Sequence, residues 1–180
     1  MKRLFSLPFP LVFMMTFTIG TFAQDFQGLD KSPMDMATFP SSYRVQDKAV
    51  RVTYSRPQLK GRDLSQLAPA GKVWRTGANE AAEITFYKDA QLGDKSVKAG
   101  TYALFTIPGE NEWTIILNSQ LNQWGAYSYS DGADVVRVSG TVSSGKKSLE
   151  AFSIAFDEAG DGAQMVMGWG TTRVNVPLAF

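Results

Sequence analysis

Two polar clusters in this sequence contain residue types that could form a ligand-binding site. The first cluster begins at Arg56 and closes with Trp74, Arg75, Asn79 and Glu80. An arginine guanidinium can clamp a carboxylate, phosphate or sulfate through two parallel hydrogen bonds. An indole ring can supply a stacking wall, while an amide and a carboxylate fix the orientation of a ligand. One interpretation of this cluster is therefore a polar pocket for a small anionic ligand.

The same residues also allow a purely structural interpretation. Arg75 and Glu80 could form an internal ion pair that attaches a long loop to the rest of the fold. Trp74 would then be the hydrophobic plug of that attachment. The two interpretations predict different exposures for Trp74. The pocket interpretation requires a ring that solvent can reach, and the plug interpretation requires a buried ring.

The second cluster, residues 122–129, contains Trp124 and Tyr127 next to amide side chains. Aromatic rings beside amides are typical of a sugar-binding platform, because the ring faces stack on sugars and the amides hydrogen-bond to hydroxyl groups. The alternative is a loop that packs its aromatic side chains back against the edge of the fold. The sequence leaves both interpretations open.

The composition excludes several kinds of chemistry. The chain has 180 residues with no cysteine and no histidine, and its formal net charge is +1. Disulfides, thiolate nucleophiles, imidazole bases and the common zinc, haem and iron–sulfur sites are therefore excluded. A net charge near zero argues against nucleic acid as the main partner. The sequence predicts no catalytic site, no metal site and no cofactor, and it indicates no particular protein partner.

The first 23 residues have the pattern of a secretory signal peptide. Lys2 and Arg3 precede an apolar run, and Thr21 and Ala23 stand at the −3 and −1 positions of a cleavage site. A membrane anchor is the alternative, because the uncharged stretch is long enough to span a bilayer. Proline and glycine residues interrupt that stretch, which favours cleavage. We therefore expect an exported protein, periplasmic or secreted, with no membrane span after cleavage.

The remaining chain reads as short strands separated by turns. Val50, Val52 and Tyr54 alternate with polar residues, and similar segments recur at short intervals with glycine and aspartate turns between them. This pattern predicts an all-β fold, an antiparallel β-sandwich of jelly-roll or immunoglobulin-like type, as a single domain over residues 45–180. One long irregular loop is expected between Ser55 and about Ala82. Residues 24–44 are aperiodic and predict an extended or disordered N-terminal arm.

Several longer strings resemble those of domain-of-unknown-function family 2911, a family of exported proteins, mostly of Bacteroidetes-type bacteria. The resemblance covers about residues 45–180 and rests on the segments 55–57, 71–81, 99–102, 105–109 and 122–127. It implies a signal peptide and a compact β-rich domain. It implies no established activity and supplies no catalytic residues.

The function most consistent with these features is a non-catalytic envelope module that binds a glycan, a peptide or a small anion. The candidate ligand-binding residues are Arg56, Trp74, Arg75, Asn79, Glu80, Trp124 and Tyr127. One alternative is a hydrolase or lyase with Glu80 or Glu83 as acid/base and Arg75 as charge stabiliser. Another is a structural interaction protein. Glu80 and Glu83 are expected on opposite faces of a strand, which would make them a poor glycosidase pair.

Overall fold

The computed structural model describes residues 24–180, and the predicted signal peptide, residues 1–23, lies outside them. The described chain is almost entirely β-structure. Its strands are β1 (Met34–Phe39), β2 (Val50–Ser55), β3 (Ala82–Phe86), β4 (Ala90–Leu92), β5 (Lys95–Val97), β6 (Gly100–Ile107), β7 (Glu112–Asn118), β8 (Asp134–Ala159) and β9 (Gly162–Ala179). Two short helices, α1 (Leu64–Leu67) and the 3-10 turn η1 (Asp131–Ala133), lie in connections. Over residues 24–180, no helix has the length and hydropathy needed to cross a bilayer.

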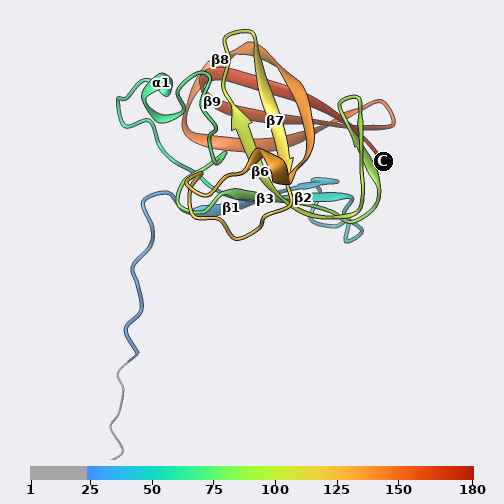
Figure 1. The fold of residues 1–180 in the computed structure, drawn as a ribbon, viewed down its shortest axis with the longest axis horizontal. Helices are drawn as coiled ribbons and strands as arrows, with labels where there is room; N and C mark the ends of the chain where they lie inside the picture. Colours follow the sequence, from blue (N-terminus) through green and yellow to red (C-terminus); the bar gives the residue numbers. More distant parts are fainter. Residues whose placement is uncertain (1–23) are drawn as a thin grey trace, which may run out of the picture.

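All nine strands form one antiparallel sheet in the order β1-β2-β3-β6-β7-β8-β9-β4-β5. β8 and β9 are 26 and 18 residues long, and their pairing shifts register between Ser144 and Ser153. Irregular pairing of this kind bends a sheet. Figure 1 shows the two long strands curving around the molecule, so that one sheet folds over on itself. This arrangement confirms the expected all-β, sandwich-like fold.

The two halves of the folded sheet are also joined by the segment that follows β2. After β2, the chain pairs with β8 around Ala151. Leu59 N–H donates to the Glu150 carbonyl and Phe152 N–H donates to the Pro57 carbonyl, each at 2.9 Å. A buried side chain of β2 adds a further bond to β8, because Ile154 N–H donates to the Tyr54 hydroxyl at 2.9 Å. These bonds satisfy backbone groups that an open strand edge would leave unpaired.

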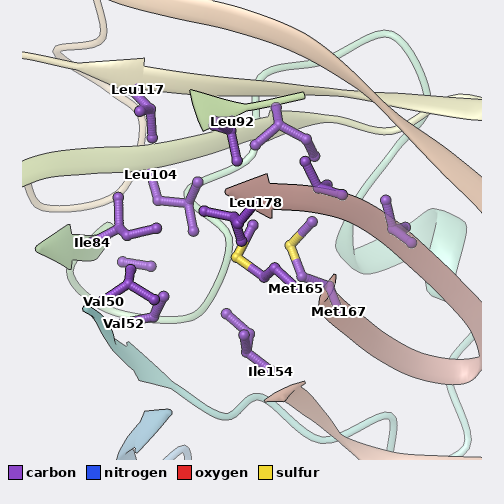
Figure 2. Close-up of a cluster of buried hydrophobic side chains, with 14 of the residues drawn as sticks. Val50, Val52, Ile84, Leu92, Leu104, Leu117, Ile154, Met165, Met167 and Leu178 are labelled. Carbon is purple, nitrogen blue, oxygen red and sulfur yellow. The ribbon is translucent and has the colours of Figure 1, made fainter. Parts of the chain in front are cut away.

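The core lies between the two halves. In β2, the side chains of Val50, Val52 and Tyr54 are buried while Arg51 and Thr53 face outward, as the alternation predicts. Figure 2 shows side chains from both halves converging: Ile84 and Leu104 from one layer, Met165 and Leu178 from the other. Removing such apolar surface from water is the main favourable contribution to folding, about 25 cal/mol per Å².

The N-terminal arm differs from the expectation in one segment. Residues 34–39 form the edge strand β1, paired with β2 through six residue pairs from Met34–Ser55 to Phe39–Val50. This part of the arm is therefore ordered within the sheet, while the chain before Pro33 runs away from it (Figure 1). The segment has only Thr38 and Phe39 as good strand formers, and its pairing with β2 overrides its weak propensity.

Candidate functional site

Trp74 belongs to the core. Its ring is 5% exposed and packs against Trp113, Phe152 and Trp169, with ring centroids 5.0 to 6.0 Å apart. Its backbone is bonded to β6 in both directions, with Trp74 N–H on the Thr106 carbonyl at 2.7 Å and the reverse bond at 2.9 Å. The ring is therefore not available as a stacking wall for a ligand. The plug interpretation describes its position.

Arg56 is engaged within the protein. Its guanidinium forms an ion pair with Asp35 of β1 at 2.9 Å and donates to the Phe152 carbonyl at 3.0 Å and to Ser153 Oγ at 2.7 Å. These partners come from β1 and β8, on either side of Arg56. The side chain thus links the edge strand to the far half of the sheet, and a ligand anion would have to compete with Asp35 for it.

Arg75 does not pair with Glu80. No ion pair between them occurs among residues 24–180, and Arg75 Nε is buried without a hydrogen-bond partner there. The Arg75 carbonyl accepts a hydrogen bond from Ala82 N–H at 3.0 Å, which fixes the start of β3. The loop is therefore attached by backbone bonds and by Trp74, and the expected Arg75–Glu80 ion pair is a prediction that the structure does not support.

Asn79 places Glu80 opposite the second cluster. Asn79 has φ of +59°, a left-handed conformation that asparagine tolerates better than most residues. Its carbonyl accepts from Gly125 N–H at 2.9 Å, and Ala81 N–H donates to the Gln123 carbonyl at 2.8 Å. Glu80 and Trp124 consequently form an antiparallel bridge pair. The side chains of directly opposed residues lie on the same side, with Cβ atoms about 5 Å apart.

Trp124 is the exposed tryptophan of the protein. Its side chain is 62% exposed, whereas the other three of the four tryptophans are 5% exposed or less. Tyr127 is 87% exposed, and its ring lies over Gly125, where a Cβ atom would come 2.7 Å from Tyr127 Cε2. A glycine with φ of +70° is therefore required at the turn between the two rings. The loop exposes both aromatic rings, and Trp124 is the one paired with Glu80.

A cavity of about 260 Å³ is lined by Glu80, the bridge partner of Trp124, but not by Trp124 itself. Its lining residues come from β1, β2, the start of β3 and the second cluster, and they are Met34, Thr53, Tyr54, Ser55, Glu80, Ala81, Glu83 and Asn122. The Glu83 carboxylate accepts a hydrogen bond from Asn122 N–H at 2.9 Å, which ties the loop to β3. We call this cavity together with Trp124 the Glu80–Trp124 site.

Both glutamates line this one cavity, so the expectation that they face opposite sides is wrong. The alternation of side chains holds only within a strand. β3 begins at Ala82, and Glu80 precedes it, directly after the left-handed residue Asn79. The turn at Asn79 therefore brings Glu80 to the outer face of the sheet, where Glu83 already lies beside Thr53 of β2.

The loop that carries Trp124 is fixed to the outer face of the sheet. Tyr129 packs edge-on against Phe105 of β6, with ring centroids 5.0 Å apart. Its hydroxyl donates to the Asp134 carboxylate at 2.7 Å and lies 2.7 Å from Arg137 Nη2, which donates to it. Burial, followed by the hydrogen bond to Asp134, raises the pKa of Tyr129 to about 12. Trp124 is thus presented by an anchored loop, which lowers the entropy lost on binding.

The chemistry of the site follows from its lining. Two carboxylates, the Asn122 amide and the hydroxyl groups of Thr53 and Ser55 can accept or donate hydrogen bonds, and no lysine or arginine lines the cavity. Such a site suits hydroxyl groups or a cation better than an anion. Over residues 24–180, no three histidine, cysteine, aspartate or glutamate side chains gather closely enough to hold a metal ion.

Of the residues that line the cavity, the sequence identified Glu80 as a candidate ligand-binding residue, and it did not identify Met34 or Thr53. Thr53 could have been identified, because it is an outward-facing residue of a strand whose alternation is clear. Met34 could not, because its strand carries little sequence signal. No short sequence pattern indicates that Glu80 and Trp124 are neighbours, because the two residues are far apart in the chain.

Comparison with known proteins gives the family of the chain. Residues 32–178 match the family described as "Protein of unknown function (DUF2911)". Searches of curated proteins and of solved structures gave no match. The matched range includes β1 and almost all of β9, so it covers nearly the whole sheet and every residue of the Glu80–Trp124 site. The chain therefore belongs to the DUF2911 family.

Proposed function

We propose that this protein is an exported, non-catalytic carbohydrate-binding module that binds glycans at the Glu80–Trp124 site. The observation that carries the proposal is the exposed indole of Trp124, held by a backbone bridge on the same side as the carboxylate of Glu80. This juxtaposition offers an apolar ring face and a strong hydrogen-bond acceptor to one ligand.

A sugar has surfaces that match both groups. The C–H face of a pyranose ring is apolar and stacks on an aromatic ring, and its hydroxyl groups donate to carboxylates and amides. Glu80 and Glu83 supply acceptors, and Asn122 supplies a further polar group at the cavity. Tyr127, three residues from Trp124 and 87% exposed, extends the aromatic surface along the loop.

The other two ligand classes fit this site less well. A small anion would meet two carboxylates and no lysine or arginine among the lining residues. A peptide usually anchors through a buried apolar pocket, whereas only Met34 and Ala81 are aliphatic among the residues that line this cavity.

Export is part of the proposal and rests on the sequence. The pattern of residues 1–23 is that of a signal peptide, and the absence of cysteine means that the domain needs no disulfide in an oxidising compartment. A glycan-binding role suits the cell envelope, where polysaccharides are abundant. Detection of a chain that begins at Gln24 in the periplasmic or secreted fraction would support export, and an intact N-terminus in the cytoplasm would contradict it.

The binding proposal is tested by calorimetric titration with a set of neutral cell-envelope oligosaccharides. We expect saturable binding of at least one oligosaccharide, weakened about tenfold or more in Trp124→Ala and in Glu80→Gln, where tenfold corresponds to about 1.4 kcal/mol. Tyr43→Ala is the matched control, because Tyr43 is 85% exposed and lies outside the site. Equal affinity in Trp124→Ala and Tyr43→Ala would contradict the proposal.

A second candidate, glycoside hydrolysis, is favoured by one observation: Glu80 and Glu83 line the same cavity. Glycosidases use a pair of carboxyl groups, one as acid and one as nucleophile or base. Arg75, the expected charge stabiliser, does not line the cavity and has no part in this candidate. Release of reducing sugar by the wild type that is abolished in Glu80→Gln would favour hydrolysis over binding alone.

A further inference from the structure

A second cavity lies on the outer face of the same sheet and contains an arginine without an acidic partner. It has a volume of about 210 Å³ and is lined by Gln46, Asp47, Lys48, Arg51 and Tyr87. Its position is set by β2, because Arg51 and the site residue Thr53 are two residues apart on the outward face of that strand. Two residues of a strand span about 7 Å.

The side chain of Arg51 is held in place, but its hydrogen-bonding capacity is unused. Its guanidinium carbon lies 5.6 Å from the centroid of the Tyr87 ring, a cation–π arrangement. Its Nε is buried and has no hydrogen-bond partner, and Arg51 forms no ion pair among residues 24–180. A buried donor without an acceptor is unfavourable, and an anion in the cavity would relieve it.

The neighbours of Arg51 do not supply the missing acceptor. Its cross-strand partners are Thr38 of β1 and Thr85 of β3. The Thr38 hydroxyl donates to the Pro40 carbonyl, and the Thr85 hydroxyl is bonded to Thr101 Oγ1 at 2.9 Å. Neither hydroxyl group accepts a hydrogen bond from Arg51 Nε.

Lys48 adds a second fixed positive charge. Its ammonium donates to the carbonyls of Pro40 and Ser42 at 2.6 and 2.8 Å, so it is positioned by neutral groups. Asp47 is the one carboxylate among the lining residues. The cavity thus combines two cations, one carboxylate and the Gln46 amide, and it retains a net positive charge.

Other arginines of the protein differ from Arg51. The guanidinium groups of Arg56 and Arg137 each bind a carboxylate, and that of Arg173 donates to three backbone carbonyls. Arg75 also has a buried Nε without a partner, but it lines none of the cavities described above. Within the described residues, Arg51 alone combines an unused donor, a cation–π contact and an open cavity.

We propose that the Arg51 cavity is a subsite for an oxyanion group, a carboxylate or a phosphate, carried by the ligand of the neighbouring Glu80–Trp124 site. A planar guanidinium can donate two parallel hydrogen bonds to such a group. The link to a sugar ligand rests on the proposed function. Together, the two sites specify an acidic glycan: one sugar ring stacks on Trp124, and the acid group lies further along β2, at Arg51.

The direct test observes the Nε–H signal of Arg51 by NMR while inorganic phosphate or galacturonate is added to the full mature chain. We expect a saturable shift of the Arg51 signal with at least one probe, and the probe that produces it identifies the acid group. Arg44 is the internal control, because its guanidinium also lies over a tyrosine ring but its Nε already donates to the Tyr43 hydroxyl at 3.3 Å. An Arg51 signal that responds no more than that of Arg44 to either probe would overturn the subsite.

The link between the two sites is tested with oligogalacturonate and its neutral methyl ester. Arg51→Gln should lower the affinity for the acid about tenfold, to the level of the ester, and leave the ester unaffected. Arg51→Lys should recover only part of the loss, because lysine keeps the charge but not the paired donors. Arg44→Gln should change neither affinity. Equal losses in Arg51→Gln and Arg44→Gln would overturn the inference.

The two proposals fail in different ways. Weakening of neutral-sugar binding by Trp124→Ala together with a silent Arg51 signal would support the proposed function and overturn the subsite. A saturable Arg51 response to phosphate, with no oligosaccharide bound by the wild type, would support the subsite and overturn the glycan proposal. Thermal melts of both Arg51 variants show whether each is folded before its affinity is interpreted.

Discussion

Glu80 and Trp124 oppose each other in a single antiparallel bridge, although one precedes β3 and the other lies in the connection between β7 and β8. The bridge is possible because Asn79 and Asn122 both adopt left-handed conformations, with φ of +59° and +58°. The two segments thereby turn toward each other on the outer face of the sheet. A carboxylate that lines a cavity and an indole ring far from it in the sequence thereby become neighbours.

The core role of Trp74 leads to a stability prediction. Trp74→Ala removes a ring that contacts three other aromatic side chains, so it should lower the free energy of unfolding by about 3–5 kcal/mol. Trp124→Ala is the matched control and should change it by less than about 0.5 kcal/mol, because the ring is exposed. Urea denaturation of the two variants measures both values. Similar losses in both would contradict the assignment of one ring to the core and the other to the surface.

The anchoring of the binding loop can be tested at Asp134. Its carboxylate accepts from Tyr129, Arg137 and Asn118, so Asp134→Ala leaves three donors without their partner. We expect a loss of about 1–3 kcal/mol in stability and faster proteolysis within residues 119–133. Asp131→Ala, at an exposed aspartate in the adjacent turn η1, should leave both nearly unchanged. Equal proteolysis rates in the two variants would show that Asp134 does not hold the loop.

The pH dependence of stability follows from the phenol of Tyr129. Burial and the bond to Asp134 raise its pKa from 10.0 to about 12, so the folded protein favours the neutral phenol. This stabilisation is fully present below pH 10 and is lost as the pH rises from about 10 to about 12. Tyr129→Phe should therefore flatten the fall in unfolding free energy over that range. Burial also raises the pKa of Tyr54. The unfolding free energy of Tyr129→Phe should therefore still fall with rising pH, but less than that of the wild type. An unchanged slope in Tyr129→Phe would contradict this account.

The fold was predictable where side chains alternate within a strand. Val50, Val52 and Tyr54 indicated an inner face for β2, and the structure confirms it. β1 was missed because Met34–Phe39 gains its order from pairing with β2, which is a tertiary effect. The bend in β8 and β9, which creates the two layers, also depends on long-range pairing.

The candidate site was predictable in its residue types but not in its grouping. The sequence pointed to Glu80, Trp124 and Tyr127 and also to Trp74 and Arg56. The structure assigns Trp74 to the core and Arg56 to an internal ion pair with Asp35. An aromatic residue beside polar residues has the same local sequence whether its ring points inward or outward. Only the pairing of the loop with β6, through Thr106, decides the orientation of Trp74.

The most direct test of the Glu80–Trp124 site is iodide quenching of tryptophan fluorescence with and without a neutral envelope oligosaccharide. Only Trp124 is substantially exposed, so the quenchable fraction of the emission should come from that ring and should be absent in Trp124→Phe. A bound sugar should shield the ring and reduce quenching in a saturable manner. Saturable binding by calorimetry with no change in the quenching of Trp124 would contradict the claim that the ligand rests on this ring.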